Sequence, residues 1–475
     1  MLDVDITPSS LDRFEAILEP EAHRAFAGEM REAVECFGGR TLWCVNSTPK
    51  GGGVAEVLTS LMGYLAGAGI DARWMAIDGD EDFFALTKRI HNRLHGEDGD
   101  GEPLGSEERR LYEECLRPSA EELGRRVEPD DLVIVHDPQP AGLVPELKRL
   151  GATVVWRCHI GVDEPNGTAT RTWDFLRPFV QKADLCVFSR RAYVWSGLQR
   201  VEIVPPSIDP FSPKNQDLEP DAVASILRAA GLVEGQPAVP ARFARKDGSE
   251  GTVSARADVV GGPLPEGAPS VVQVSRWDRL KDPVGVLRGF ARHVPEETGT
   301  HLVLAGPRVD GVSDDPQQDE VLGEVRAAWE GLPPTERERV HLASLPTRDD
   351  EENAAIVNAL QRRAAVVVQK SLAEGFGLTV AEAMWKERPV IASGVGGIRD
   401  QIVHGESGLL IDDPADLEAF GGAVARLLRD PEGAARMGRA ARERVREEFL
   451  PTRHLLKYVK LLRRLGAEAS SETPA

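Results

Sequence analysis

Short apolar runs alternate along the chain with longer stretches whose apolar residues recur at helical spacing. The runs are rich in Val, Ile and Leu, which predicts strands of parallel sheets that are covered on both faces. Strands are expected at 41–45, 72–77, 132–135, 153–158 and 185–188, and again at 271–274, 302–304, 340–342, 365–368 and 390–392. Helices are expected near 54–68, 81–94, 107–124, 141–150 and 171–182, and near 283–294, 318–330, 351–363, 379–387 and 415–428. Two such series predict an α/β protein with two doubly wound, Rossmann-like domains.

The chain passes from the first series to the second near residue 205. We therefore place an N-terminal domain at 1–205 and a C-terminal domain at 206–448. The segment 233–268 breaks the alternation because it is rich in Gly, Pro and charged residues. We interpret it as a surface insertion with a hairpin at 243–257. The small polar residues after Gly466 predict a disordered tail.

Composition narrows the range of partners. The 475 residues include 57 Lys and Arg against 77 Asp and Glu, which gives a formal net charge of −20. This acidity argues against binding to nucleic acid or to an anionic membrane, because both require a basic surface. A small anionic ligand held by a few local cations remains compatible with it. The five cysteines form no CxxC pair, and the start lacks a signal-like apolar segment. We therefore expect a cytoplasmic protein. A homodimer is the default expectation for its assembly.

Polar residues and glycines follow the strands of the first series, at the edge where open parallel sheets bind ligands. Gly52 and Gly53 open a predicted helix, where backbone N–H groups can bind an anion, although a flexible turn is the alternative. His159 could bond a ligand hydroxyl or donate a proton, but a histidine at a strand end is often structural. The candidates for binding a small polyol acceptor are Asn46, Asp137 and Gln139; the prolines beside the last two also allow a turn without a ligand.

The second series carries charged candidates in the same position. Arg276 and Lys281 follow one buried strand, and two fixed cations could neutralise a diphosphate leaving group. A solvated surface pair is the alternative. Glu374 and Glu382 are eight residues apart, the first before a predicted helix and the second within it. One carboxylate could meet a sugar hydroxyl and the other a ribose, whereas a capping acid and a surface acid are the alternative.

These loops together resemble the retaining GT-B glycosyltransferases of the family called GT4. The segments VSRWDRLKDP and EGFGLTVAE carry most of the similarity. Within that family the chain is most similar to the group of trehalose glycosyltransferring synthases and trehalose phosphorylases, through NSTPKGGGVAEVL, VHDPQPAGLV, HIGVDEPN, VQKSLAEGFGLTVAEAMW and RPVIASGVGGI. The resemblance covers residues 40–450 and implies two domains that face each other across a cleft. It also implies that the segment 449–475 contains a helix that crosses back to the first domain.

The resemblance also implies roles for individual residues. Glu382 is expected to contact the donor ribose and Glu374 the hydroxyls of the transferred glucose. Arg276 and Lys281 would hold the diphosphate, and His159 would touch the glucose 6-hydroxyl or the reaction centre. The remaining residues expected at the donor are Gly52, Gly53, Gly375, Phe376, Gly377 and Leu378.

The expected activity is a retaining transfer of glucose from a nucleoside diphosphate glucose to free glucose, which gives α,α-trehalose. The substrates are small sugars, and we expect neither a metal nor another cofactor. Three alternatives stay open. They are a phosphorylase that splits trehalose with phosphate, a transferase with another small acceptor, and a nucleotide-sugar sensor without catalysis.

Overall fold

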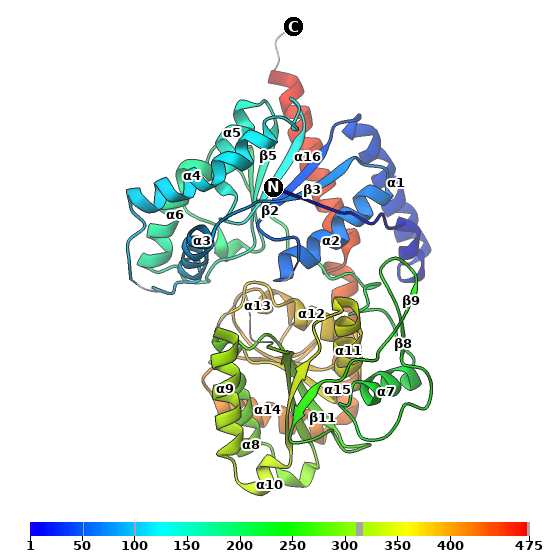
Figure 1. The fold of residues 1–475 in the computed structure, drawn as a ribbon. Coiled ribbons are helices and arrows are strands. Elements are labelled where there is room, and N and C mark those ends of the chain that lie inside the picture. The colour runs from blue at the N-terminus through cyan, green and yellow to red at the C-terminus, as the bar shows by residue number, and fades with distance from the viewer. Residues whose placement is uncertain (51, 99–100, 310–316, 473–475) are drawn as a thin grey trace. The chain divides into compact units, whose positions relative to one another are not determined.

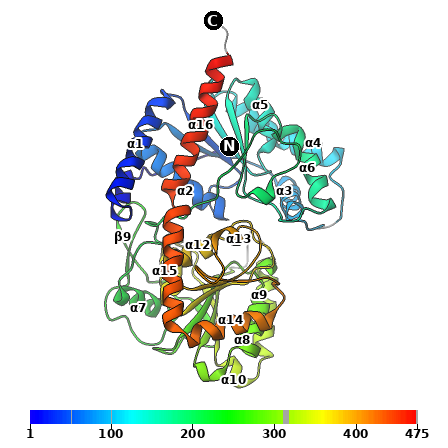
Figure 2. The same ribbon diagram turned by 180° about the vertical axis from the view of Figure 1, so that it is seen from behind.

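The computed structural model describes residues 1–50, 52–98, 101–309 and 317–472, with side chains described as far as residue 465. The chain divides into two compact units (Figures 1 and 2). Unit 1 contains Met1–Ser207 together with the C-terminal segment from Pro451, and unit 2 is Ile208–Leu450. Both boundaries lie two residues beyond those placed from the sequence. The backbone of the last helix continues to Glu472, so the tail expected to be disordered after Gly466 is helical through that residue.

The core of unit 1 is a seven-stranded sheet in the order β1-β3-β2-β4-β5-β6-β7. β1 pairs antiparallel with β3, and the other neighbouring strands pair in parallel. The strands are β1 Leu2–Val4, β2 Leu42–Asn46, β3 Ala72–Ala76, β4 Leu132–His136, β5 Thr153–Cys158, β6 Leu185–Phe188 and β7 Val201–Ile203. Every residue of β2, β4 and β6 is buried, as the apolar runs predict for strands covered on both faces.

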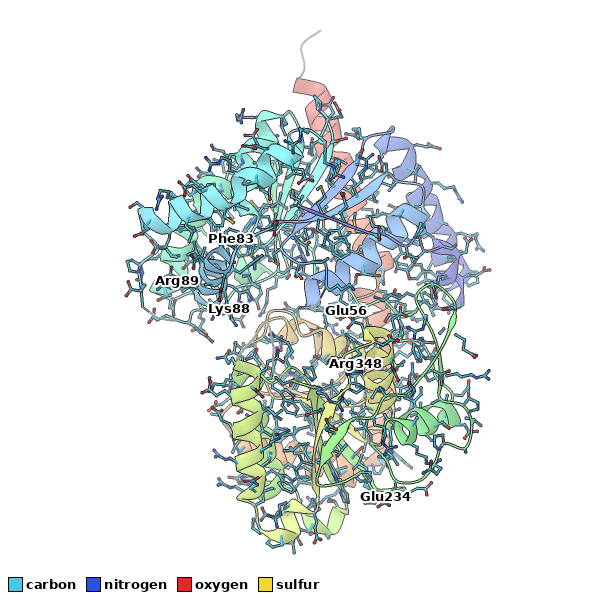
Figure 3. The ribbon with its side chains drawn as sticks, in the orientation of Figure 1. Glu56, Phe83, Lys88, Arg89, Glu234 and Arg348 are labelled. Atoms are coloured by element: carbon cyan, nitrogen blue, oxygen red, sulfur yellow. The ribbon has the colours of Figure 1, made fainter. Side chains whose placement is uncertain are left out.

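Two groups of helices cover this sheet. The helix α16 packs against α1 and α2, whereas α3, α4, α5 and α6 pack against one another (Figure 2). Figure 3 labels Phe83, a residue of α3. Phe83 is fully buried and stacks on Tyr112 with ring centroids 5.9 Å apart. The helices are α1 Pro20–Phe37, α2 Gly52–Gly67, α3 Glu81–Leu94, α4 Ser106–Leu123, α5 Val144–Arg149, α6 Gly167–Val180 and α16 Pro451–Glu472, with short 3-10 helices at Leu11–Ala16, Ala141–Leu143 and Arg191–Tyr193.

Unit 2 is built around a second seven-stranded sheet, in the order β10-β13-β12-β11-β14-β15-β16. Only the pairing of β10 with β13 is antiparallel among its described strands. The strands are β10 Asp258–Val260, β11 Ser270–Val274, β12 His301–Pro307, β13 Val340–Leu345, β14 Val366–Gln369, β15 Val390–Ser393 and β16 Leu409–Ile411. A separate hairpin consists of β8 Arg242–Ala244 and β9 Glu250–Thr252.

The helices of unit 2 also contact one another. α8 contacts α9 and α14, whereas α7 contacts α11, and α12 contacts α15. The helices are α7 Pro220–Ala229, α8 Pro283–His293, α9 Gln317–Glu330, α10 Pro334–Arg337, α11 Asp350–Arg363, α12 Leu378–Trp385, α13 Ile398–Gln401, α14 Leu417–Arg429 and α15 Pro431–Glu448, with 3-10 helices at Arg279–Lys281 and Glu296–Thr298.

The strand orders locate a switch point in each sheet. In unit 1 the chain continues from β2 to β3 on one side and then to β4 on the other side of β2. In unit 2 it continues from β11 to β12 and later returns to place β14 on the other side of β11. Open parallel sheets bind ligands at such points, beyond the carboxyl ends of the two strands. A ligand site is therefore expected at the loops after β2, β4, β11 and β14.

The segment 233–268 differs from the surface insertion expected. A hairpin is present, but it begins at Arg242 and ends at Thr252, whereas 243–257 was expected. The next strand, β10, does not stay on the surface but extends the main sheet of unit 2 by pairing with β13. Arg245, in the turn of the hairpin, forms ion pairs with Asp349 at 2.6 Å and Glu351 at 3.1 Å. The segment is therefore an integral edge of unit 2.

Candidate functional site

The two loops at the switch point of unit 2 are joined to each other. The loop after β11 contains Leu280 and Lys281, and the loop after β14 contains Leu372 and Glu374. The backbone N–H of Leu372 donates to the carbonyl oxygen of Leu280 at 2.7 Å. Gln273, near the end of β11, donates its side-chain amide to the carbonyl oxygen of Lys281 at 3.0 Å. These bonds hold the two loops in one register.

Lys281 and Glu374, both expected at the donor, meet at this junction. The Nζ atom of Lys281 lies 2.7 Å from Oε1 and 2.6 Å from Oε2 of Glu374. The hydroxyl of Ser371 donates to the same carboxylate at 3.0 Å. Only 18% of the lysine side chain and 11% of the glutamate side chain are exposed, so the pair is largely removed from solvent. A cation and a carboxylate held side by side can serve a phosphate and a sugar hydroxyl together.

Arg276 lies in the same loop but in a different environment. Its side chain is 57% exposed, and Nη2 lies 3.1 Å from Oδ2 of Asp278. The structure therefore brings Lys281 and Glu374 together, while the guanidinium of Arg276 bonds an acid of its own loop. The sequence left open that Arg276 and Lys281 are a solvated surface pair. That alternative fits Arg276, which is exposed, but not Lys281, which is largely buried.

The glycine-rich turn after Glu374 sets the start of α12. Gly377 precedes the helix with a φ of 86°, in the left-handed region, and a Cβ here would lie 3.0 Å from Cγ1 of Ile398 and 3.2 Å from Cγ of Glu374. Both the conformation and the space therefore require glycine. The carbonyl oxygen of Gly375 accepts the N–H of Gly397 at 2.9 Å. Phe376 is buried and packs edge-on against Phe449 at 5.7 Å.

The helix that follows carries the second glutamate. α12 begins at Leu378, so Glu374 precedes the helix and Glu382 lies within it, as the sequence predicts. Glu382 is only 2% exposed, and its Oε1 lies 3.5 Å from Nζ of Lys214. Each glutamate thus has a lysine beside it. Sequence reasoning missed Lys214, because no pattern links residue 214 to residue 382.

At the switch point of unit 1, the glycines occupy the start of α2. Gly52 is its first residue, with a φ of 78°, and Gly53 its second; Gly51 lies outside the described residues. Asn46, at the end of β2, accepts a hydrogen bond from Trp74 Nε1 at 2.9 Å and donates to the carbonyl oxygen of Thr48 at 2.7 Å. These bonds give Asn46 a role in shaping the loop.

Two histidines stack at the carboxyl ends of β4 and β5. His136 Nδ1 lies 3.1 Å from Nε2 of His159, and the ring centroids are 5.4 Å apart. Burial lowers the pKa of His136 to about 3, and the charge of Arg157 acts in the same direction. The pKa of His159 is also well below its usual range, because of burial and then the same guanidinium. Both imidazoles are therefore neutral at pH 7.

The acid beside these histidines is perturbed in the opposite sense. Asp137 adopts a φ of 67° and accepts the backbone N–H of His159 on Oδ1 at 2.7 Å. Burial raises its pKa to about 7, against the opposing effects of that hydrogen bond and of Arg157. The side-chain Oε1 of Gln139, two residues on, is buried without a hydrogen-bond partner among the described residues. These groups can exchange hydrogen bonds with neutral hydroxyls.

Arg157 was missed by sequence reasoning. It is 0% exposed within β5, and its Nη2 lies 3.4 Å from Oγ of Ser189. The signal was an arginine inside the apolar run TVVWRC. Burying a charge at such a position costs free energy unless neighbouring groups pair with it or form hydrogen bonds to it.

Two kinds of site are not found in the described ranges. No three His, Cys, Asp or Glu side chains of those residues gather where they could hold a metal ion. In the same part of the chain, no helix combines the length and apolar character needed to cross a bilayer.

Known proteins resemble this chain over most of its length. A family model described as "Trehalose synthase, N-terminal domain" matches residues 44–195, and one described as "Glycosyl transferases group 1" matches residues 346–444. A trehalose synthase of Rubrobacter xylanophilus is 38% identical over 93% of this chain and 94% of that protein. A trehalose phosphorylase of Grifola frondosa is 27% identical over 85% of this chain but only 54% of that protein.

A solved structure supports the fold. The α,α-trehalose 6-phosphate synthase of Burkholderia multivorans superposes with a TM-score of 0.67 at 18% identity, over 92% of this chain and 99% of that one. At this identity the likeness concerns the fold, and it agrees with the two doubly wound sheets described above. With the GT-B fold and a relative that matches nearly the whole chain, the chain belongs to the trehalose synthase family of glycosyltransferases.

Proposed function

We propose that the protein transfers glucose from a nucleoside diphosphate glucose to the anomeric hydroxyl of free glucose, giving α,α-trehalose with retention. The observation that carries the proposal is the buried pair of Lys281 and Glu374 at the switch point of unit 2. It offers a cation for a diphosphate beside a carboxylate for sugar hydroxyls, next to the glycine turn at the start of α12. The 38% identical trehalose synthase supports the choice of product.

The reaction breaks the bond between C1 of glucose and the diphosphate oxygen, and forms a bond between C1 and the acceptor oxygen. The acceptor proton goes to the departing phosphate, so no separate base is needed. An α-linked donor and an α,α product require net retention at C1. In the single displacement proposed here, the acceptor attacks the face from which the diphosphate leaves. Lys281, with Arg276, neutralises the charge that grows on the leaving group.

The remaining residues have supporting roles in this proposal. Glu374 accepts hydrogen bonds from the hydroxyls of the transferred glucose, and Glu382 from the donor ribose. His159, Asp137 and Gln139 of unit 1 exchange hydrogen bonds with sugar hydroxyls. Their neutral or nearly neutral state suits an uncharged acceptor, since burying an unpaired charge against a sugar would be costly.

Product analysis tests the proposal directly. The purified protein is incubated with glucose and with ADP-, UDP-, GDP- or TDP-glucose in turn, and the products are identified by NMR. We expect α,α-trehalose and the free nucleoside diphosphate with at least one donor. A disaccharide with another linkage would show attack by a different hydroxyl of glucose or a different stereochemical course, and release of glucose alone would show hydrolysis; either result contradicts the proposal.

The phosphorylase alternative is tested in the same series. Trehalose and inorganic phosphate are offered without nucleotide, and formation of glucose 1-phosphate is measured. The similarity to a trehalose phosphorylase, at 27% identity, is the reason to test this reaction. This chain spans only about half of that protein's length. We expect no glucose 1-phosphate above background.

We also propose that the reaction needs no metal, because Lys281 and Arg276 supply the positive charge at the diphosphate. Turnover in a metal-free buffer with EDTA is expected to equal turnover with added Mg²⁺. A rate that falls at least tenfold with EDTA and returns with Mg²⁺ would contradict this part of the proposal.

A further inference from the structure

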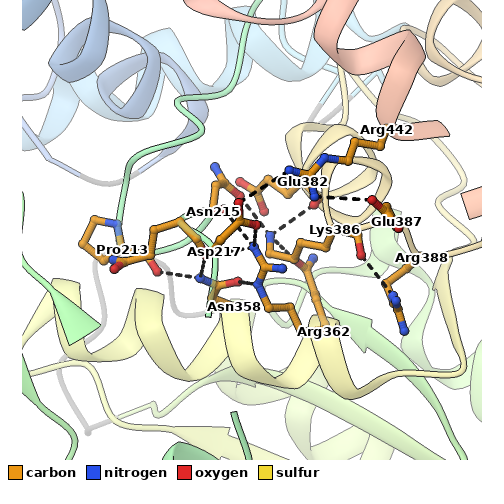
Figure 4. A network of polar contacts seen from close by, with 12 residues as sticks. Pro213, Asn215, Asp217, Asn358, Arg362, Glu382, Lys386, Glu387, Arg388 and Arg442 are labelled. Atoms are coloured by element: carbon orange, nitrogen blue, oxygen red, sulfur yellow. Dashed lines mark hydrogen bonds and ion pairs between the residues drawn. The ribbon is translucent and has the colours of Figure 1, made fainter. Parts of the chain in front are cut away.

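Lys386 is a buried lysine one turn beyond Glu382 (Figure 4). It is only 2% exposed. Its Nζ donates to Oδ1 of Asn215 at 2.9 Å, to Oε1 of Gln361 at 2.8 Å and to the carbonyl oxygen of Glu382 at 3.1 Å. An ammonium has three N–H groups, so each has an acceptor. The three acceptors come from three different segments of unit 2.

Two consecutive residues of the segment 212–217 reach α12. Asn215 accepts from Lys386, and its neighbour Lys214 lies 3.5 Å from the carboxylate of Glu382. Glu382 and Lys386 are four residues apart on or next to one helix, so they share a face. The segment therefore meets this face at both the carboxylate and the ammonium.

The segment is itself fixed from the other side by α11. Asn358 donates to the carbonyl oxygens of Pro213 at 3.1 Å and Gln216 at 2.8 Å. Arg362 donates to the carbonyl oxygen of Gln216 at 2.9 Å and to Oδ1 of Asp217 at 2.8 Å (Figure 4). α11 holds the segment 212–217 in place. The hydrogen bond that Lys386 donates to Asn215 therefore fixes the end of α12 against a segment that is itself held.

Burying a lysine against a helix costs more free energy than burying an apolar side chain there. Removing an ammonium from water costs several kcal/mol unless oxygens replace its hydration. An apolar side chain could fill the same space, but it would not impose a direction on α12. Of the three hydrogen bonds, the one to the carbonyl oxygen of Glu382 lies within the helix turn itself. The oriented hydrogen bonds to Asn215 and Gln361, which lie outside α12, define where the helix lies along its axis and how it is rotated. Both properties decide where the carboxylate of Glu382 is held.

We infer that Lys386 is a positioning residue of the donor site, which fixes the carboxylate of Glu382 by tying α12 to the segment 212–217. The inference rests on the proposed function, in which Glu382 binds the donor ribose. Lys386 does not touch the substrate. Its loss should therefore weaken donor binding through Glu382 and leave the chemical step almost unchanged.

The test compares Lys386→Met with Arg388→Met. Arg388 lies just beyond α12, and its Nε donates to the carbonyl oxygen of Lys386 at 3.1 Å, so its loss disturbs the same region without removing the ammonium. Binding of ADP, UDP, GDP and TDP is measured by calorimetry, and KM and kcat are measured with the best donor. We expect Lys386→Met to raise Kd and KM on the order of tenfold with kcat within about twofold. Arg388→Met should leave both constants near those of the wild type.

A double-mutant cycle separates positioning from general damage. Glu382→Gln is combined with Lys386→Met. If the lysine acts through the carboxylate, the second change adds less than about twofold to the Kd of Glu382→Gln. Full additivity would overturn the inference.

Two further outcomes are distinct. Wild-type protein that binds none of the nucleotides would overturn the proposed function together with the inference. Wild type that binds a nucleotide, with Lys386→Met binding it equally, would overturn the inference alone. If Lys386→Met fails to fold, Asn215→Ala removes one acceptor and keeps the ammonium. It must then raise Kd without changing kcat, and an unchanged Kd overturns the inference.

Discussion

The carboxyl edges of the two sheets carry different kinds of polar groups. At the switch point of unit 2, charges are held in pairs, Lys281 with Glu374 and Lys370 with Asp282. At the edge of unit 1, burial lowers the pKa values of the neighbouring histidines and raises the pKa of Asp137 to about 7. A diphosphate is charged and a free sugar is not. The paired charges of unit 2 therefore match the diphosphate proposed to bind there, and the neutral groups of unit 1 match the uncharged sugar proposed to bind at that edge.

The largest effect is expected where unit 2 buries a charge. Lys370 is 0% exposed, and its Nζ bonds the carboxylate of Asp282. Asp282→Asn keeps the oxygen that caps α8 at the N–H of Gly285 but removes the negative charge. Because a buried cation then loses its charged partner and keeps the carbonyl oxygen of Pro414 as an acceptor, the free energy of unfolding should fall by about 3–5 kcal/mol. Urea denaturation measures this loss.

Asp278→Asn is the matched control. Asp278 caps the N–H of Leu280 at 2.8 Å, as Asp282 caps α8, but its ion-pair partner Arg276 is exposed. The loss should stay below about 1 kcal/mol. Equal losses for the two variants would show that burial does not make the pair of Lys370 and Asp282 more important for stability than an exposed pair, and the comparison between the edges would fail.

The next largest effect concerns the reaction. Lys281→Met removes the cation proposed to stabilise the leaving diphosphate, so kcat should fall by about 10²–10³-fold, or about 2.7–4 kcal/mol. Arg279→Met is the control, because Arg279 lies in the same loop but pairs with Glu320 and Glu324 on the exposed surface. Its kcat should remain within about twofold of the wild type. Steady-state kinetics at saturating donor checks both, and an unchanged kcat for Lys281→Met would contradict the role proposed for Lys281.

Sequence patterns were sufficient for the central strands, because each is an apolar run covered on both faces. Among the described residues, five α-helices were missed. Four of them begin with proline, at Pro20, Pro220, Pro334 and Pro431, whereas α13 begins at Ile398. Proline is favoured at the first position of a helix, so a usable signal was present. Short edge strands such as Leu409–Ile411 have too few residues to show a period.

The site was predictable only as a set of loops. Polar residues after strands identify the carboxyl edge of a sheet, and this brought Lys281, Glu374 and His159 into consideration. Which of them touch depends on strand order, since Lys281 and Glu374 are 93 residues apart and meet because β11 lies next to β14. Alternation of strands and helices does not specify that order. The burial of Arg157 likewise depends on what covers β5.

A smaller effect is expected from the histidines. Unit 2 has a second stacked pair, in which His301 Nδ1 lies 2.9 Å from Nε2 of His341, but at the amino ends of β12 and β13. His136→Gln should lower kcat/KM by roughly tenfold, because His159 loses a neighbour that orients its ring. His341→Gln should lower the free energy of unfolding, since it loses the bond to Gly262, and leave kcat/KM unchanged. Equal kinetic losses would show that position at the carboxyl edge does not matter.

The last difference between the units lies in how two acids respond to pH. Burial raises the pKa of Asp137 in unit 1 to about 7, whereas the hydrogen bonds from Arg245 lower the pKa of Asp349 in unit 2 to about 2. The folded protein therefore keeps the proton of Asp137 between pH 4 and 7, where the unfolded chain loses it, so the stability contributed by this group is lost as pH rises through 7. The contribution of Asp349 is instead present above pH 4 and lost as pH falls toward 2.

Asparagine variants isolate the two contributions. The difference in unfolding free energy between Asp137→Asn and the wild type should shift in favour of the variant as pH rises from 4 to 7, by at most about 1.4 kcal/mol per pH unit. For Asp349→Asn the variant should be the less stable protein at neutral pH, and its deficit should shrink as pH falls from 4 to 2. Urea denaturation at closely spaced pH values gives both differences. Two curves of the same sign would mean that the carboxylate of unit 1 is as well stabilised as that of unit 2, and that the edge proposed for the sugar does not favour neutral groups.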